Sequence, residues 1–500
     1  MVKYIPTIGL EIHAELKTRT KMFCDSKNDP DETRPNINIC PICMAHPGTL
    51  PAINKEAVKH IIKIGKAVRG GIADFTQFDR KNYFYPDIPK GYQISQYKNP
   101  IVSGGELDGV RLTRVHLEED TARSSHDASD THSLVDFNRA GIPLMELVTE
   151  PVIESAQTAV RFARELQLLL RTLGVSDANM EKGEMRVEAN VSVVPVAKAG
   201  STPIEMAKVF TPRDSNHAGT KFANKLGIKV EIKNINSFRA VEKAIEYEIA
   251  RQSAALEKGE NIVQETRGWD ENKQETFSQR IKETSDDYRY FPEPDLPPLK
   301  ISLVSDFQNI QLFELPWEKR ERYQKEYGIK SEDIEFYVFN KEFADFFEKV
   351  VGGLDGGKET IQLTSNYITS DLVGILKTSL GMRSPSVLGD AIPKHFATLI
   401  QMIQGNEVSS RGAKDILAIM LKDGGEPSKI AEEKGLLQQS DESALKIVAQ
   451  KIISENQKVV DEYKNGKKSA IQFLVGQGMK ETKGAANPET LKKIFKTLLK

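Results

Sequence analysis

Two carboxylates and an imidazole alternate with apolar residues near the start of the chain. Over residues 8–16 every second residue is apolar, and Glu11, His13 and Glu15 lie between the apolar positions. On a β-strand alternate residues share a face and lie about 7 Å apart. Carboxylates on one face repel one another unless a positive charge lies between them, so the pattern fits a divalent-cation site. It also fits a half-exposed strand whose polar face meets water.

Three later glutamates are candidates to complete such a site. Glu118 and Glu119 are adjacent, so a strand would direct them to opposite faces and only one could join the site. The spacing does not choose between them, and a charged turn is the alternative. Glu146 lies in the otherwise apolar run 142–148. A carboxylate in such a run must be paired, protonated or bound to metal, unless the strand is half exposed.

A basic loop lies between these acidic segments. Residues 78–90 place Arg80, Lys81 and Lys90 among aromatic residues and prolines. Fixed cations beside aromatic surface suit the binding of phosphate and nucleotides. Ordinary surface loops have the same composition.

The three cysteines of the chain are Cys24, Cys40 and Cys43. They would provide three of the four ligands of a structural zinc site, with His46 or Asp25 as the fourth. Reduced thiols without metal are the alternative. So few cysteines also argue against the disulfide framework of a secreted protein.

Hydrophobic patterning predicts an α+β fold. Residues 8–16, 110–117 and 229–234 alternate as strands do, and residues 156–173 have apolar residues at helical spacing. Together they predict a first domain of mixed sheet and helices over residues 1–297.

The rest of the chain is predicted to be helical. Four prolines in residues 291–298 interrupt the pattern and mark the first boundary. Residues 298–405 form a helical domain, in which one helix begins at Pro316. Residues 406–500 form a smaller helical domain, and Asn487 or a neighbour caps its last helix.

Composition indicates a soluble globular protein. The net charge is −2, with 39% hydrophobic and 28% charged residues. We find no signal-peptide pattern and no apolar run near the eighteen or so residues that a membrane span needs, so we expect a cytoplasmic protein. Residues 458–500 carry ten lysines against four acidic residues. This basic end suits a nucleic-acid contact or a solvated helix face.

Longer motifs resemble, in the same order, the B subunit of the aspartyl/glutamyl-tRNA amidotransferases, the GatB/GatE family. They are residues 9–18, 78–90, 91–96, 116–120, 133–139, 231–238 and 285–295, while residues 463–466 and 473–477 resemble the family's YqeY-like tail. The resemblance covers essentially the whole chain. It implies a cradle domain with a Mg-ATP site, a helical domain, and a tail domain that contacts the tRNA.

The resemblance also implies the activity and the partners, in a three-subunit enzyme. The glutaminase (A) subunit supplies ammonia, and the small C subunit completes the complex. The B subunit, part of an ATP-dependent ligase, phosphorylates the side-chain carboxylate of Glu-tRNA(Gln) or Asp-tRNA(Asn), and ammonia displaces the phosphate to give Gln-tRNA(Gln) or Asn-tRNA(Asn). A carboxylate is a poor electrophile, and phosphorylation supplies the leaving group that it lacks. The sequence does not tell which tRNA is the substrate.

Site residues follow from the matched motifs. The resemblance implies that His13, Glu119 and Glu146 bind Mg²⁺, with Glu11 and Glu118 beside them. It thereby selects Glu119 over Glu118. Basic residues of the same pocket, which are Arg80, Lys81 and Lys90, are implied partners of the ATP phosphates. Zn²⁺ at Cys24, Cys40 and Cys43 is a further expectation.

Three features differ from the family's pattern. Ser26 stands where many relatives have the fourth cysteine of the zinc segment. Glu188 stands where the family usually has aspartate. Residues 195–226 are longer than the corresponding loop.

Two other functions remain open from the sequence. The chain would be a tRNA-binding and assembly protein if its acidic strand were only structural. It would be a free-standing kinase or ligase for a small amino acid if it were active without partners. Loss of amidation in His13→Ala or Glu146→Ala variants that still bind tRNA would distinguish the first hypothesis from the tRNA-binding one. Full activity of the lone chain on a small substrate would favour the free-standing enzyme.

Overall fold

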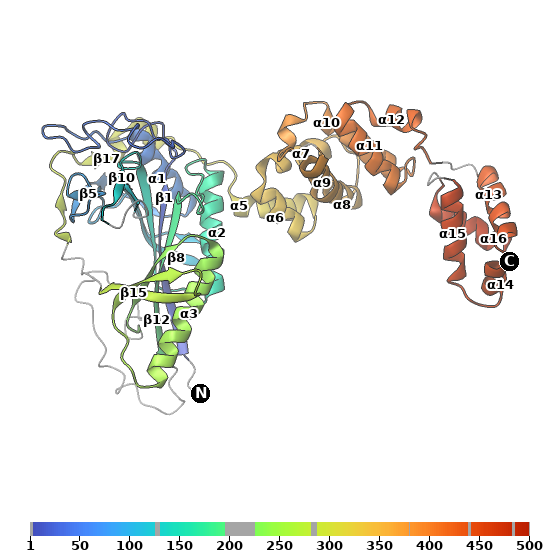
Figure 1. Ribbon diagram of the computed structural model, residues 1–500. Coiled ribbons are helices and arrows are strands. Elements are labelled where there is room, and N and C mark those ends of the chain that lie inside the picture. Colours follow the sequence, from blue (N-terminus) through green and yellow to red (C-terminus); the bar gives the residue numbers. More distant parts are fainter. Residues whose placement is uncertain are drawn as a thin grey trace. The chain divides into compact units, whose positions relative to one another are not determined.

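The computed structural model describes residues 4–125, 131–195, 226–281, 288–379, 381–438, 442–482 and 486–499. The chain forms two compact units, Met1–Leu315 and Pro316–Lys500. The first contains a large sheet and three long helices, and the second is built of helices (Figure 1). The predicted α+β class is therefore confirmed. The insertion predicted over residues 195–226 lies almost wholly outside the described residues.

Ten strands form one mixed sheet in the first unit. The order is β15-β14-β13-β12-β1-β11-β8-β6-β2, and β7 pairs with β8. Strands β13 and β14 are parallel, and the other pairs are antiparallel. The bounds are β1 Tyr4–Glu15, β2 Gly71–Ile72, β6 Val102–Ser103, β7 Glu106–Leu107, β8 Val110–Glu119, β11 Pro143–Thr149, β12 Met185–Pro195, β13 Val230–Ile235, β14 Glu265–Asp270 and β15 Glu275–Ile281.

Strand β1 lies between β11 and β12, and its two faces differ. Its apolar residues Ile8, Leu10 and Ile12 are at most 1% exposed, so they belong to the core. The polar residues between them lie on the other face, which therefore carries the chemistry. Strands β1, β8 and β13 confirm the three strands that alternation predicts.

Three helices accompany the sheet, as Figure 1 shows for α2 and α3. They are α1 (Lys55–Ala67), α2 (Ala156–Thr172) and α3 (Phe238–Glu257). Helix α2 confirms the amphipathic helix predicted over 156–173, and the Ser155 side chain caps it by accepting a hydrogen bond from the backbone of Thr158. Its apolar face, which includes Phe162 and Leu166, is fully buried.

Shorter strands form small sheets at the side of the unit. Strands β16 (Phe291–Pro292), β4 (Asp79–Asn82) and β5 (Tyr92–Ser95) lie in that order, β17 (Leu299–Lys300) pairs with β3 (Phe75–Thr76), and β9 (Arg123–Ser125) pairs with β10 (Leu134–Asp136). The pairing of β17 with β3 fastens the segment after the proline run to the first unit. The 3₁₀ turn η2 (Ile301–Leu303) and α4 (Ser305–Gln308) follow, so the first compact unit ends after the boundary predicted at 297.

The second unit contains helices and short helical turns throughout its described part. They are α5 Pro316–Arg322, η3 Tyr323–Tyr327, α6 Ser331–Phe339, α7 Lys341–Val351, α8 Lys358–Asn366, η4 Tyr367–Leu372, α9 Val373–Ser379, η5 Pro385–Val387, α10 Ile392–Gln404, α11 Ser410–Asp423, α12 Pro427–Glu433, α13 Glu442–Glu455, α14 Gln457–Lys464, α15 Ala470–Glu481 and α16 Pro488–Leu498. The helix predicted to begin at Pro316 is confirmed as α5. The division of this unit at residue 405 stays a prediction.

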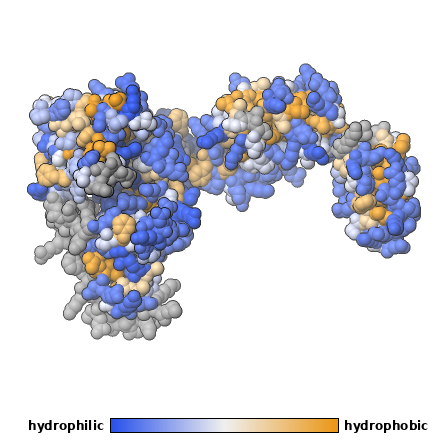
Figure 2. Space-filling view, viewed as in Figure 1, coloured by the Kyte–Doolittle hydropathy of each residue, from blue (hydrophilic) through white to orange (hydrophobic). Residues whose placement is uncertain are grey.

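The four C-terminal helices α13–α16 share an apolar core. Leu445, Leu474, Leu491 and Phe495 are fully buried in it. The Asn487 side chain caps α16 by accepting hydrogen bonds from two backbone amides, as predicted. Hydrophilic residues predominate on the face of this bundle that Figure 2 shows. In the described part of the chain, no helix has both the length and the apolarity to cross a membrane.

Candidate active site

The register of three central strands brings ionisable side chains together. His13 on β1 is paired with Glu146 on β11, and Glu146 is paired with His116 on β8. Residues directly opposite on antiparallel strands have side chains about 5 Å apart on the same face. Since alternate residues share a face, Glu11 and Glu118 lie on it too.

His13 lies at the centre of this group. Its Nε2 atom is 3.8 Å from an oxygen of Glu11, 3.6 Å from one of Glu118 and 3.5 Å from one of Glu146. The Glu118 and Glu146 side chains are 3% and 7% exposed, whereas Glu11 is 29% exposed. Three carboxylates therefore converge on one imidazole, and only Glu11 is open to water.

Burial and mutual repulsion shift the pKa values of these side chains. Burial and the Glu146 charge raise the pKa of Glu11 to about 7, and the same two causes raise the pKa of Glu118. Burial disfavours the charged form of His13, but its hydrogen bond with Glu146 and the charges of Glu118, Glu146 and Glu11 raise its pKa to about 9. The protonated imidazole supplies part of the positive charge that these carboxylates need, and Arg114, 3.1 Å from Glu146, supplies more.

A divalent cation fits this group. Ligand atoms of Glu11, His13 and Glu146 lie within 4.8 Å of one another, and those of His116, Glu118 and Glu146 do so as well. Atoms that share one small cation, each about 2.1 Å from it, lie roughly 3–4 Å apart, as the His13 contacts do. A cation would also neutralise carboxylates whose burial is otherwise costly.

His116 and Arg114 belong to this site, although the sequence predicted no role for them. Arg114 donates hydrogen bonds to Nδ1 of His116, at 3.3 Å, and to Glu146, at 3.1 Å. Nε2 of His116 lies 3.4 Å from Glu146. Burial lowers the pKa of His116 to about 4, so its imidazole is neutral. The signal for His116 was its spacing of two residues from Glu118, which places both on one face of a strand.

The two adjacent glutamates face different surroundings. Glu118 reaches His13 and accepts a hydrogen bond from the Ser95 hydroxyl at 3.0 Å. Glu119 accepts from the Lys90 ammonium at 2.7 Å and from the backbone of Ile94 at 2.9 Å. The structure thus places Glu118, and not Glu119, beside His13. The resemblance had implied Glu119 as the metal ligand.

The three basic residues of the loop also differ from one another. Both ends of the Arg80 guanidinium bind the buried Glu293 carboxylate, at 2.7 and 2.8 Å. Lys90 is paired with Glu119. Of the three, only Lys81 has a side chain without an ion pair or hydrogen bond among the described residues. Burial opposes the charge of Lys81, but the neighbouring charges of Glu118 and Glu146 raise its pKa well above the usual value.

The acidic face continues across β12 onto β13. Glu188 is paired with Glu11 in the strand register, and Glu231 lies on the next strand. Ligand atoms of these three carboxylates lie within 4.8 Å of one another. The Lys233 ammonium lies 2.8 Å from Glu188 and compensates part of their charge. Glu188, which replaces the usual aspartate, therefore has its carboxylate beside the site.

Glu15 belongs to a separate cluster. Its strongest interactions are with Asp120, Arg139 and Arg186, and it makes no contact with His13 among the described ion pairs. Arg186 donates to both oxygens of Asp120 at 3.0 Å, and Arg139 lies 3.6 Å from it. Burial and the Asp120 charge raise the pKa of Glu15 to about 8.

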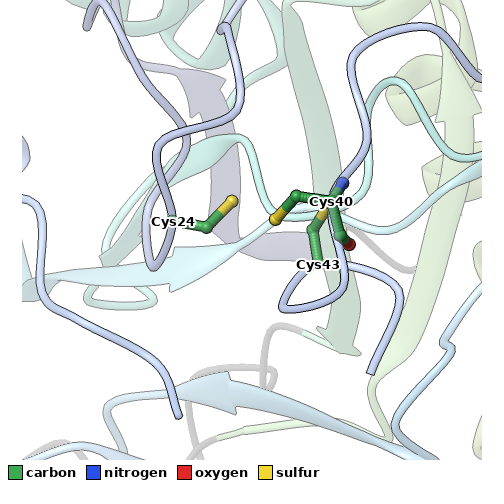
Figure 3. Close-up of side chains that lie close together, drawn as sticks. All are labelled: Cys24, Cys40 and Cys43. Carbon is green, nitrogen blue, oxygen red and sulfur yellow. The ribbon is translucent and has the colours of Figure 1, made fainter. Parts of the chain in front are cut away.

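The three cysteines converge in a loop next to the basic pocket. Figure 3 shows their sulfur atoms facing one another, and all three are free thiols within 4.8 Å. Sulfurs that share one tetrahedral zinc lie about 3.8 Å apart, so the three fit as ligands after a small movement. The Ser26 hydroxyl is 3.8 Å from the Cys43 sulfur, and the buried Lys21 ammonium is 3.7 Å from it. The Ser26 hydroxyl and the Lys21 ammonium therefore both lie beside the thiols.

A cavity of about 190 Å³ joins the cysteines to the basic loop. Its walls include Cys24, Cys43 and His46 on one side and Lys90 and Glu119 on the other. His46, a predicted candidate for the fourth zinc ligand, thus lines the same cavity as two of the thiols.

Comparison with known proteins identifies two matching domain families. The GatB/GatE catalytic domain matches residues 6–305, and the GatB domain matches residues 345–499. A protein of Crocosphaera subtropica is 42% identical over 519 residues, which cover 99% of this chain and 98% of the relative. One of Thermotoga maritima is 42% identical over 513 residues, covering 100% and 99%. Both are named as the B subunit of an aspartyl/glutamyl-tRNA(Asn/Gln) amidotransferase.

Proposed function

The chain belongs to the GatB/GatE family, and on that premise we propose that it is the component of a tRNA-dependent amidotransferase that activates the tRNA-borne carboxylate. The substrate is Glu-tRNA(Gln) or Asp-tRNA(Asn). The complete enzyme is a glutamine-hydrolysing ligase, in which a glutaminase subunit and a small third subunit are the partners of this chain. The observation that carries the proposal is the buried group of His13, Glu118 and Glu146 inside the matched catalytic domain.

The reaction has two steps. An oxygen of the substrate carboxylate attacks the γ-phosphorus of ATP, the bond to the β-phosphate oxygen breaks, and ADP leaves. Ammonia then attacks the carbonyl carbon of the acyl phosphate, the carbon–oxygen bond breaks, and phosphate leaves as the amide forms. The protein must position the substrate carboxylate and the phosphates of ATP, and balance their negative charge.

Glu11, His13, Glu118 and Glu146 would hold Mg²⁺ in this site. We place Glu118 rather than Glu119 in the set because Glu118 faces His13 and Glu119 is bound to Lys90. The ion, when bound, neutralises charge on the transferring phosphoryl group. Arg114 and the neutral His116 hold Glu146 in place through hydrogen bonds and close contacts.

Lys81 is the cation available to the ATP phosphates. Its ammonium has no competing partner among the described residues, whereas Arg80 is bound to Glu293 and Lys90 to Glu119. We therefore assign the phosphate contact to Lys81. Arg80 and Lys90 shape the pocket instead.

Two further parts of the chain fit this function. The thiols of Cys24, Cys40 and Cys43 would hold a structural Zn²⁺, and free thiols in the chain accord with work in the cytoplasm. Lys464, Lys467 and Lys468 are exposed on the C-terminal bundle, where they would contact tRNA phosphates.

The test uses the reconstituted three-subunit complex with each misacylated tRNA. His13→Ala and Glu146→Ala should abolish amidation while tRNA binding and complex formation persist. Normal amidation by either variant would show that the acidic group is structural and would favour the tRNA-binding and assembly hypothesis. The two tRNAs, assayed separately, identify the substrate.

A further inference from the structure

The Lys81 ammonium lies among aromatic rings. Its Nζ is 5.1 Å from the ring centre of Tyr288 and 5.8 Å from that of Tyr83. These two rings meet edge to face at 5.9 Å, and Tyr288 meets Tyr290 in the same manner at 6.0 Å. A ring face attracts a cation through its quadrupole and takes away none of its charge.

Aromatic contact distinguishes Lys81 from its basic neighbours. Lys90 and Arg80 also lie near a ring, that of Tyr92, but both of them have a carboxylate partner as well. In the described part of the chain the Lys81 ammonium has only ring contacts, and its three N–H donors are not used by protein groups. A lysine stem is flexible, so such an ammonium needs another means of being held in place.

The rings themselves are firmly held. The Asn82 side chain donates to the backbone oxygens of Tyr288, at 3.1 Å, and Arg289, at 2.8 Å. Next to it, β16 pairs with β4. Asn82 directly follows Lys81, and its side chain binds the backbone of the segment that carries Tyr288, whose ring lies against the Lys81 ammonium.

Two more contacts complete the support. Tyr290 stacks on Tyr97 with a centre-to-centre distance of 4.3 Å and an angle of 10°. The Tyr83 hydroxyl donates to Gln93 at 3.4 Å, and Gln93 in turn donates to the backbone oxygen of Glu119 at 2.7 Å. Each wall around Lys81 is therefore anchored to another part of the domain.

We infer that Tyr288, with Tyr83, is a positioning residue that holds the Lys81 ammonium beside the acidic face with its charge and N–H donors free for a phosphoryl group. An ion pair at this position would cancel the charge and occupy the donors. Ring faces hold the cation and leave both available. This inference rests on the proposed function, because the phosphoryl group is that of ATP or of the acyl phosphate.

The experiment measures amidation by the full complex with Lys81→Ala, Tyr288→Leu, Tyr288→Phe and the double variant of Lys81→Ala with Tyr288→Leu. Tyr288→Leu should lower kcat by roughly tenfold, with a smaller change in KM for ATP. Tyr288→Phe keeps the ring face and should restore most of the rate. The double variant should be no slower than Lys81→Ala alone, because both act through one ammonium.

The matched control is Tyr247→Leu. Tyr247 is a half-buried tyrosine in an edge-to-face pair with Trp269, and within the described residues no cation lies over its ring, so it reports the cost of losing a ring in the same domain. Its kcat should stay within about twofold of the wild type, because changes away from a site have small effects.

Three outcomes overturn the inference: unchanged kcat in Tyr288→Leu, an equal loss in Tyr288→Phe, or additive losses in the double variant. If Tyr288→Leu does not fold, phenylalanines of increasing fluorination at position 288 keep the ring shape and weaken its quadrupole, and kcat should fall along that series. A constant kcat along it also overturns the inference. Full activity of Lys81→Ala would instead contradict the proposed phosphate contact, so the two failures are distinguishable.

Discussion

Glu118 and Glu119 are neighbours on β8, yet their negative charges are balanced in different ways. On the Glu119 side each charge has a partner, since Lys90 and the Ile94 amide satisfy the carboxylate. On the Glu118 side three carboxylates converge on the His13 imidazole. Arg114 pairs with Glu146, but within the described residues no lysine or arginine pairs with Glu118. A buried carboxylate without a lysine or arginine partner, rather than a buried charge as such, therefore marks the reactive side of this sheet.

Glu118 and Glu119 should differ most in how their replacement changes the amidation rate. Glu118→Gln should lower the amidation rate by roughly 100-fold or more, the usual cost of removing an electrostatic stabiliser of the transition state. Glu119→Gln should lower it much less, because its carboxylate does not face His13. Initial rates at saturating ATP and tRNA measure both. Equal losses would break the comparison.

Replacement of Glu118 and of Glu119 should also change the stability of the chain differently. Glu119→Gln leaves the half-buried Lys90 ammonium without its charged partner, so the free energy of unfolding should fall by about 2 kcal/mol. Glu118→Gln removes a charge from a repulsive group, so stability should stay the same or rise. Urea unfolding of the free chain, followed by the circular dichroism of the backbone, measures the difference. A less stable Glu118→Gln variant would contradict the assignment.

Mg²⁺ binding should depend on His13 and not on Glu119. Mg²⁺ at about 100 times its dissociation constant should stabilise the chain by roughly 2.7 kcal/mol, provided that it binds only the folded state. This gain should disappear in His13→Ala and remain in Glu119→Gln. Thermal unfolding with and without Mg²⁺ tests it. Retention of the gain in His13→Ala would place the ion elsewhere.

The smallest effect concerns Glu15, which lies on the acidic face of β1 but in a partly compensated cluster. Burial and Asp120 raise the pKa of Glu15 from 4.5 to about 8. Between these two values the folded chain retains a proton that the unfolded chain has lost, so stability falls as the pH rises. Glu15→Gln should flatten this slope in urea unfolding at pH 5, 6.5 and 8. An unchanged slope would show that Glu15 is ionised in the folded chain.

Local patterns predicted the elements well. Alternation correctly predicted β1, β8 and β13, helical periodicity predicted α2, and capping chemistry predicted Asn487 at α16. Each of these signals is local, because it depends on residues within one element. Recognition of the family is also local, because its motifs are contiguous segments.

The site was predicted less completely. His13, Glu11, Glu118 and Glu146 do come together, whereas Glu119 turns to Lys90. The spacing alone left Glu118 and Glu119 undecided, and the resemblance selected the one that faces away from His13. His116 and Arg114 were missed although they alternate with Glu118 along β8 and so share its face. Their place opposite Glu146 depends on the pairing of β8 with β11, which no single segment shows.

Which residues share a face of a strand can be read from the sequence, since alternation along a strand is a local property of the backbone. Which residues stand opposite one another depends on how the strands pair. The register of β1, β11 and β8 sets His13, Glu146 and His116 in one row, and a slip of one residue would have turned a strand's whole set to the other face. Likewise, Arg80 meets Glu293 from 213 positions away and Lys81 meets Tyr288, because chain folding joins segments that no local pattern connects.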